Sequence, residues 1–257
     1  MRLKGKKALV TGASRGIGRA TALLCAEEGA SVVVSDLDPG EADAVAAEII
    51  EGGGRAVAVA ADLSDPQHAK GMVDSAIAAF DGLDIVINNA GVPKVHQPTL
   101  GLDDWEAWDN VWDINVRSVF ISCQQAAVWM KEHGGGKIVN VGSQTGISGQ
   151  PYVNAYGPSK AAIHNMTRSL AVEWAKFKIN VNAVAPCWTR TLRLEAAIEK
   201  GVTSEEEIAK RCPMGRAAEP EEVAKAIVFL ASDDADFITG AVLPVDGGWL
   251  ASGYGAV

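Results

Sequence analysis

The stretch Lys7–Gly18, which reads KALVTGASRGIG, decides the fold of this chain. An apolar run at residues 7–10 leads into a glycine-rich turn, and an apolar helical pattern then continues up to Gly29. Glycines let the backbone turn tightly and approach a diphosphate, while the N–H groups at the start of the helix attract its negative charge. A second apolar run, residues 31–35, leads to Asp36, about where a ribose-binding acid is expected. This order of strand, glycine turn, helix and strand predicts a dinucleotide-binding unit.

The rest of the chain continues this alternation of strands and helices, which is typical of a parallel sheet covered on both faces. We therefore predict an α/β fold: a single-domain, doubly wound, Rossmann-type sheet of seven mostly parallel strands with helices on both faces. The predicted strands are 7–10, 31–35, 56–60, 85–88, 137–141, 180–185 and 241–245, and the predicted helices are 16–28, 41–51, 66–80, 104–132, 154–177 and 220–231. No linker or change in composition divides residues 1–257, so we expect one dinucleotide-binding catalytic domain.

Tyr156 and Lys160 stand four residues apart, so in a helix both side chains project from one face. A buried ammonium beside a phenol favours the phenolate and is expected to lower its pKa from about 10, which suits a general acid or base. Ser143 follows the apolar run 138–141, and a hydroxyl at a strand end can bind a substrate oxygen. A Tyr-x-x-x-Lys alone is more often a surface pair, and only its context favours the catalytic interpretation.

With these motifs in order, the chain resembles a classical short-chain dehydrogenase/reductase from about Leu3 to Trp249. The turn 11–18 is similar to the family's cofactor fingerprint, and residues 88–91 (Asn-Asn-Ala-Gly) resemble its second signature. The segment 186–191 looks like the loop that holds the nicotinamide carboxamide. The resemblance assigns catalysis to Asn115, Ser143, Tyr156 and Lys160, and cofactor binding to Gly12, Ser14, Arg15, Gly16, Ile17, Gly18, Asp36, Asp62, Leu63, Asn89, Ala90, Gly91, Tyr156, Lys160, Pro186, Thr189 and Thr191.

The resemblance implies reversible oxidation of a secondary alcohol (polyol, sugar, cyclic or hydroxysteroid-like) by hydride transfer to a nicotinamide. Tyr156 would move the hydroxyl proton, Lys160 would also bind the nicotinamide ribose, and Ser143 would donate to the developing carbonyl oxygen. Asn115, a poor helix former in mid-helix, would break the helix locally and hold a water that relays protons to Lys160. Two other classes stay open: an NADP-dependent 3-oxoacyl-carrier-protein reductase and a non-catalytic nucleotide sensor.

The expected cofactor is NAD in preference to NADP. Asp36 is placed to accept hydrogen bonds from free ribose hydroxyls and to repel a 2′-phosphate. Arg15 opposes this prediction because it could pair with that phosphate, or it could turn to solvent or pair with Asp36. Asp62 follows the third predicted strand, and the family's matching acid binds the adenine amino group. The alternative for Asp62 is a simple helix cap, although Ser64 or Asp65 could supply the cap.

The substrate residues are the least defined. The candidates are Gln144, Gln150, Trp188 and Leu192, with Lys94, His96 and Tyr152 as further pocket residues. The irregular, charged segment of about residues 189–216 resembles the family's substrate lid, and it is equally consistent with a solvated helical hairpin. Cys187 departs from the family's usual glycine in the nicotinamide loop, which restricts positive φ there; a catalytic thiol is a remote alternative.

Composition limits the partners. A net charge of −9 disfavours nucleic acid and anionic membranes, and no apolar run approaches transmembrane length. The basic start of the chain leads straight into the first strand and lacks the apolar core of a signal peptide, so we expect a cytoplasmic protein. The four cysteines and four histidines show no metal-like spacing, so no metal site is assigned. Apolar residues on several sides of the long helices predict a homo-oligomer, most simply a homotetramer.

Overall fold

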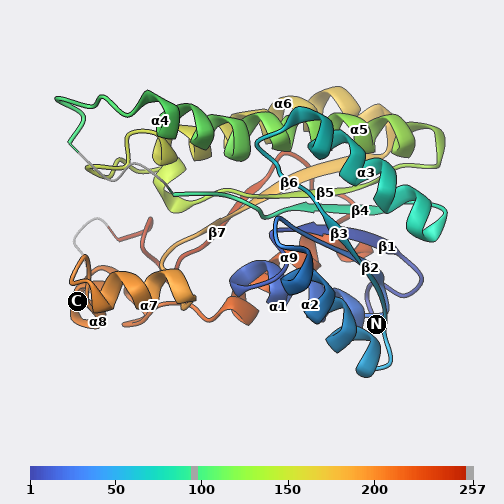
Figure 1. Ribbon diagram of the computed structural model, residues 1–257, viewed down its shortest axis with the longest axis horizontal. Helices are drawn as coiled ribbons and strands as arrows, with labels where there is room; N and C mark the ends of the chain where they lie inside the picture. Colours follow the sequence, from blue (N-terminus) through green and yellow to red (C-terminus); the bar gives the residue numbers. More distant parts are fainter. Residues whose placement is uncertain (94–97, 253–257) are drawn as a thin grey trace.

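The computed structural model describes residues 1–93 and 98–252, and its described strands form one parallel sheet (Figure 1). Its seven strands lie in the order β3-β2-β1-β4-β5-β6-β7, and every neighbouring pair is parallel. Their bounds are β1 Lys7–Thr11, β2 Ser31–Asp36, β3 Arg55–Ala60, β4 Ile85–Asn88, β5 Gly136–Val141, β6 Ile179–Pro186 and β7 Val242–Val245. The predicted doubly wound sheet is confirmed, and within the described residues it is wholly rather than mostly parallel.

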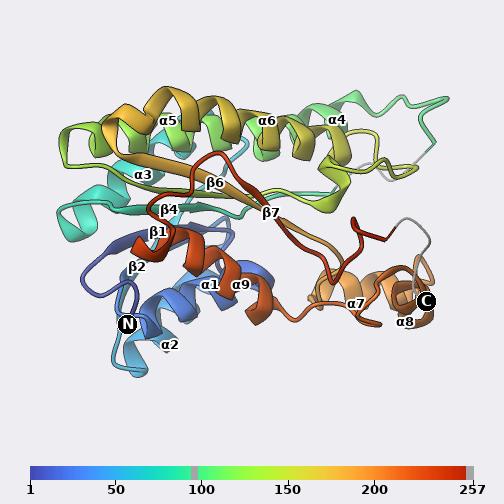
Figure 2. The same ribbon diagram turned by 180° about the vertical axis from the view of Figure 1, so that it is seen from behind.

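Helices cover both faces of the sheet, as Figures 1 and 2 show from opposite sides. One layer contains α1 (Gly16–Glu27), α2 (Pro39–Glu51) and α9 (Pro220–Ala231); the other contains α3 (Pro66–Phe80), α5 (Ser118–Glu132) and α6 (Tyr156–Trp174). Successive strand residues alternate between the two cores. Val10 packs in the core beneath α1 and α9, whereas Leu9 packs in the core beneath α3 and α5. Burial on both faces explains why the strands are almost uniformly apolar.

The predicted helix over residues 104–132 is confirmed but begins at Trp105, and the local break predicted at Asn115 is a π-helical turn. The helix consists of α4 (Trp105–Trp112), a π-helical turn at Asp113–Arg117, and α5. The side chain of Asn115, at the centre of the π turn, is fully buried and bonds to another segment, and such insertions are where π turns occur. The predicted helix 154–177 likewise begins later, at Tyr156, and closes with a 3₁₀ turn at Ala175–Phe177.

Pro158 lies in the first turn of α6 because the helix begins at Tyr156. The missing N–H of a proline costs little there, since first-turn N–H groups have no helical partner. Tyr156 and Lys160 therefore keep their regular spacing of one turn.

The segment at about residues 189–216 contains two short helices, α7 (Leu192–Glu199) and α8 (Glu205–Arg211). They lie together at one end of the molecule, apart from the two main layers (Figure 1). A small apolar cluster of Leu194, Ile208 and Ala217 holds them together, with Trp188 packed against it. No helix in the described part of the chain is long and apolar enough to cross a membrane.

The chain reverses its direction of travel across the sheet between β1 and β4. Strands β1, β2 and β3 progress outward in one direction, and β4 to β7 progress in the other. In a doubly wound sheet the crevice at the carboxyl ends of such a strand pair is where ligands bind. The residues that follow β1 and β4 are therefore the place to build the site.

Candidate active site

The glycine turn after β1 is fitted tightly against the segment after β4. Gly12 has a φ of 62°, and a Cβ there would lie 2.8 Å from the Cα of Ala90. A Cβ on Gly18 would collide with the carbonyl oxygen of Gly12. Asn89 Nδ2 donates to the carbonyl oxygens of Thr11 and Gly12, both at 2.9 Å. Glycine is required at both positions because two backbone segments meet here without side chains between them.

Thr11 was not anticipated as part of this junction. Its Oγ1 accepts hydrogen bonds from the backbone N–H groups of Asn89 and Ala90, each at 3.0 Å. Together with the Asn89 side chain, these bonds join the carboxyl ends of β1 and β4 into one rigid floor.

The start of α1 fits an anionic ligand such as a dinucleotide diphosphate. The helix has no side-chain cap and no acidic residue in its first turn, so its N–H groups remain available. Ser14 Oγ is buried and has no hydrogen-bond partner among the described residues. A buried hydroxyl without a partner is unfavourable, and a phosphate oxygen would satisfy it.

Asp36 is held rigidly at the end of β2. Its Oδ2 accepts a hydrogen bond from the Ser14 N–H at 3.0 Å, and its Oδ1 accepts one from the Leu37 N–H at 2.8 Å. Arg15 is exposed and forms no ion pair with Asp36 or with any other residue that the structure describes. The carboxylate is therefore fixed beside the glycine turn, and the exposed Arg15 does not neutralise it.

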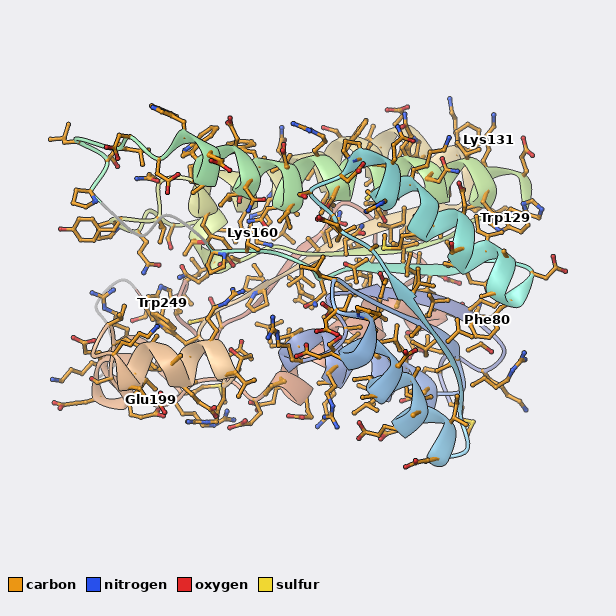
Figure 3. All side chains as sticks on the ribbon, in the orientation of Figure 1. Phe80, Trp129, Lys131, Lys160, Glu199 and Trp249 are labelled. Carbon is orange, nitrogen blue, oxygen red and sulfur yellow. The ribbon has the colours of Figure 1, made fainter. Side chains whose placement is uncertain are left out.

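Asn115 and Lys160 converge on Gly91, the last residue of the second signature. A Cβ on Gly91 would lie 3.2 Å from Asn115 Oδ1 and 3.3 Å from Lys160 Nζ. Asn115 Oδ1 accepts from the Val92 N–H at 2.9 Å, and its Nδ2 donates to the Val92 carbonyl at 3.0 Å and to Ser159 Oγ at 3.1 Å. In Figure 3, Lys160 lies toward the α7–α8 side of the molecule, away from the end marked by Phe80 and Trp129.

Ser143 is positioned by its neighbours at the end of β5. Its Oγ accepts hydrogen bonds from Thr145 N at 3.2 Å and Thr145 Oγ1 at 2.9 Å. The Ser143 N–H donates to Nε2 of the buried His164 at 3.4 Å. Tyr156 is hydrogen-bonded to the Ser143 side chain. His164 was not anticipated from the sequence, where it is one unremarkable residue of a helical pattern.

Comparison with known proteins places this arrangement in one family. The family model described as enoyl-(acyl carrier protein) reductase matches residues 12–250. A cis-4-hydroxycyclohexanecarboxylate dehydrogenase of Sinomonas cyclohexanicum is 44% identical over 244 residues, which cover 95% of this chain and 96% of that protein. The chain belongs to the short-chain dehydrogenase/reductase family. It is accordingly an NAD(P)-dependent oxidoreductase that acts on CH–OH groups, as the resemblance predicted.

Other members of the family differ in substrate and cofactor. A cyclohexanol dehydrogenase of Acinetobacter sp. is 39% identical, and the alignment covers 96% of this chain and 96% of that protein. A 3-oxoacyl-[acyl-carrier-protein] reductase of Thermotoga maritima is 38% identical, and the alignment covers 96% of this chain and 99% of that protein. A structure from Beutenbergia cavernae, assigned as an NAD(P)-dependent gluconate 5-dehydrogenase with NADP at low occupancy, superposes with a TM-score of 0.89 and 40% identity, covering 97% of this chain and 98% of that one. A 7α-hydroxysteroid dehydrogenase complexed with NADH and 7-oxoglycochenodeoxycholic acid superposes with a TM-score of 0.91 and 34% identity, covering 96% and 95%.

At this short-chain dehydrogenase site, the pKa of Tyr156 is shifted in the direction opposite to the one predicted from the sequence. Tyr156 is half-buried, and burial raises the pKa of its phenol, opposed by Arg193 and by the hydrogen bond with Ser143. The predicted lowering of the Tyr156 pKa by Lys160 is therefore wrong for this structure. Burial lowers the pKa of Lys160 to about 8, and the nearby Arg193 acts in the same direction. The Lys160 ammonium lies 5.6 Å from the Tyr156 ring centre and donates to the Val141 carbonyl at 2.8 Å.

The loop that follows β6 lies against the glycine turn. A Cβ on Gly16 would lie 3.0 Å from Thr191 Cγ2, which places Thr191 over the start of α1. Thr189 is buried, and its Oγ1 donates to the Cys187 carbonyl at 3.2 Å. Cys187 does not adopt a positive φ, so its departure from glycine introduces no strain. Burial raises the pKa of the Cys187 thiol to about 12, which disfavours a thiolate.

Asp62 is not the cap of α3. Its Oδ1 accepts from the N–H and the hydroxyl of Ser64, at 2.9 and 2.7 Å, and these bonds lower the pKa of the carboxyl. The cap is Asp65, which accepts from the Gln67 N–H at 2.7 Å. The simple cap is therefore excluded for Asp62, and the adenine-binding role stays a prediction, as it does for Leu63 beside it.

The candidate substrate residues differ in their burial and in their contacts. Gln144 is buried and its Oε1 accepts from Ser148 Oγ at 2.8 Å, whereas Leu192 is 66% exposed. Trp188 packs against the apolar cluster of α7 and α8, and Gln150 is half-buried. Tyr152 has a φ of 66°, unusual for a non-glycine residue. Lys94 and His96 lie outside the described residues.

Proposed function

We propose that the protein is an NAD-dependent dehydrogenase that interconverts a cyclic secondary alcohol and its ketone, using Asn115, Ser143, Tyr156 and Lys160. The observation that carries this proposal is the meeting of Lys160 and Asn115 at Gly91, one helical turn from the hydrogen-bonded pair Tyr156 and Ser143. The cyclic substrate class is supported by the names of the two relatives that act on substituted or plain cyclohexanols.

The nicotinamide cofactor supplies the hydride acceptor, and the residues of this chain would bind, orient and move the proton. The glycine turn, Ser14 and the N-terminus of α1 would hold the diphosphate. The Tyr156 hydroxyl would exchange the proton of the substrate hydroxyl, while Ser143 donates to the same oxygen as it gains carbonyl character. Lys160 would bind the ribose and hold a positive charge near the phenol, and Asn115 would fix the backbone around Gly91.

The preference for NAD rests on the position of Asp36. Two backbone N–H groups fix its carboxylate beside the glycine turn, so it has little freedom to move away from a 2′-phosphate. A carboxylate about 4 Å from a phosphate charge is repelled by roughly 4 kcal/mol at an effective dielectric near 20. Arg15 is the counter-argument, and NADP is bound in the gluconate 5-dehydrogenase structure described above. A preference of at least about tenfold for NAD, or about 1.4 kcal/mol, is expected.

The second candidate is an NADP-dependent 3-oxoacyl-carrier-protein reductase, favoured by the Thermotoga relative. A carrier-protein partner calls for a basic patch near the mouth of the site. The segment 189–216 with α7 and α8, which we propose forms a substrate lid, instead carries charges of both signs. Its five carboxylates are Glu195, Glu199, Glu205, Glu206 and Glu207, and its six cations are Arg190, Arg193, Lys200, Lys210, Arg211 and Arg216. This near balance is not a basic patch, and the net charge of −9 on the whole chain weakly opposes this alternative. A non-catalytic nucleotide sensor is disfavoured because all four residues of the catalytic set are present.

The test is a panel of cyclic, polyol, sugar and steroid alcohols, each with NAD and NADP, followed at the absorbance band of the reduced nicotinamide. We expect the highest kcat/KM for cyclic secondary alcohols with NAD. Equal or better efficiency with NADP, together with reduction of a 3-oxoacyl thioester, would replace the proposal with the second candidate. No turnover of any alcohol or ketone with either cofactor would remove it.

A further inference from the structure

Arg193 extends from the second position of α7 into the site. Its Nη2 donates to the Gly91 carbonyl oxygen at 3.3 Å, so a residue of the lid contacts the segment that follows β4. Gly91 is also the residue beside which Lys160 Nζ and Asn115 Oδ1 lie. The guanidinium therefore belongs to the same cluster as the proposed proton-transfer residues, although it comes from another element.

Most of the other cations in the segment 189–216 have partners. Arg190 pairs with Glu205 and Glu219, Lys210 with Glu206, and Arg216 with Glu222. Arg211 lies over the Trp249 ring, 5.8 Å from its centre. Arg193 pairs with no carboxylate among residues 1–93 and 98–252, and its one hydrogen bond there goes to a neutral carbonyl. Lys200 and Arg211 also have no carboxylate partner in the described part of the chain, and what distinguishes Arg193 is its contact with Gly91 in the site.

The charged groups that Arg193 does face are mostly cations. Lys160 and Arg15 are close enough to interact with it electrostatically, and the Tyr156 hydroxyl is the ionisable group that favours its charge. Although the Arg193 side chain as a whole is exposed, its guanidinium is partly withdrawn from water, and this burial lowers its pKa. A guanidinium near other cations and without a carboxylate partner is an arrangement that an anionic ligand stabilises.

We propose that Arg193 binds a carboxylate on the substrate, so that the preferred substrate is a hydroxy acid rather than an uncharged alcohol. This inference rests on the proposed dehydrogenase function, because it takes the reacting hydroxyl to lie at Tyr156. A substrate held there has its distal groups toward the lid, where the Arg193 guanidinium lies. The other source of anionic oxygens is the cofactor diphosphate, but Ser14 and the uncapped start of α1 already provide for that group.

The discriminating experiment compares a 4-hydroxycyclohexanecarboxylate with 4-methylcyclohexanol, which has a similar ring and no charge. Arg193→Gln should lower kcat/KM for the acid by about 10- to 100-fold, the worth of a charge-assisted hydrogen bond, and change it less than about threefold for the neutral alcohol. Arg193→Lys should recover part of the loss. The matched control is Arg190→Gln, which removes the same charge from the same segment where it is already paired, and it should affect both substrates equally.

Two results would overturn the inference. If Arg193→Gln weakened NAD binding and slowed both substrates alike, the guanidinium would serve the cofactor. If it changed neither substrate, Arg193 would have no role in binding.

A binding measurement separates this inference from the proposed function. Cyclohexanecarboxylate carries the carboxylate but no reacting hydroxyl, so calorimetry with NAD-saturated protein reports the anion contact without turnover. Binding by the wild type that is lost in Arg193→Gln supports the carboxylate site even if no alcohol is oxidised. Absence of binding by a wild type that does oxidise cyclohexanols would refute the inference and leave the proposed function standing.

Discussion

Lys160→Met is expected to make the protein more stable while it removes activity. The Lys160 side chain is only 4% exposed, and burial lowers its pKa from 10.5 to about 8. At about 1.4 kcal/mol per pKa unit, holding the charged form in the folded state at neutral pH costs roughly 3 kcal/mol. Met has a similar shape and no charge. Against this gain stands the hydrogen bond from Nζ to the Val141 carbonyl, whose loss costs about 1–2 kcal/mol. The net expectation is a stabilisation of about 1–2 kcal/mol near pH 7.

The stability difference between Lys160→Met and the wild type is expected to depend on pH. Between pH 8 and 10.5 the unfolded chain keeps the Lys160 proton and the folded protein releases it, so the free energy of unfolding of the wild type rises with pH there. The cost is fully present below about pH 8 and has disappeared by about pH 10.5. Lys160→Met lacks this titration. Its advantage over the wild type should therefore be largest near pH 7 and shrink, or reverse, toward pH 10.

Urea unfolding at pH 7 and pH 10 measures both variants, at one protein concentration because assembly would shift apparent stability. The matched control is Lys70→Met on the exposed side of α3, where substitution should change stability by no more than about 0.5 kcal/mol. The same Lys160→Met protein should show neither turnover nor normal NAD affinity. A variant less stable than the wild type at pH 7, or a difference that does not change with pH, would refute the reasoning about burial.

Three further predictions concern the reaction, the cofactor and the assembly. Tyr156→Phe should lower turnover by about 10²–10⁴-fold with NAD affinity retained, as measured by steady-state rates and cofactor titration; half of the wild-type rate would exclude Tyr156 as the proton carrier. Asp36→Ala should narrow or reverse the NAD preference in kcat/KM, because Arg15 is then unopposed, and an unchanged ratio would show that Asp36 does not face the ribose. Val172→Glu, which replaces an apolar residue that is 84% exposed on α6 by a charge, should disrupt the predicted homotetramer in light scattering, whereas a monomeric wild type would contradict the tetramer itself.

The sheet could be predicted because its signals are local. Each buried strand is a short apolar run, and each connection carries its own turn and helix signals, so residues 7–36 alone define the first unit. Pro158 and the spacing of Tyr156 and Lys160 are local as well. The helix ends were less well predicted because caps and 3₁₀ turns shift them by up to three residues.

What the sequence could not provide depends on contacts between distant segments. The bonds from Thr11 to residues 89 and 90 join positions that are 78 and 79 apart, and Arg193 meets Gly91 across 102 positions. His164 supports Ser143 from the inner face of a helix, where its pattern is that of any core residue. The pKa of Tyr156 was predicted in the wrong direction because spacing shows which groups are neighbours but not how far burial withdraws them from water.

Three polar or charged side chains around the crevice at the carboxyl ends of β1 and β4 are not fully stabilised by other residues of the chain. Ser14 Oγ is buried without a partner, Lys160 is an ammonium held where burial disfavours its charge, and Arg193 is a guanidinium without a carboxylate among the described residues. Each arrangement lowers the stability of the folded chain. An anionic cofactor and an anionic substrate would correct all three, since each supplies acceptor oxygens and negative charge. The charge of Arg193 also lowers the pKa of Lys160, so a carboxylate bound at Arg193 would favour the charged form of Lys160. The negative charge of the substrate would thus change the protonation of Lys160. Arg193, which binds the carboxylate, would in this way couple substrate binding to proton transfer.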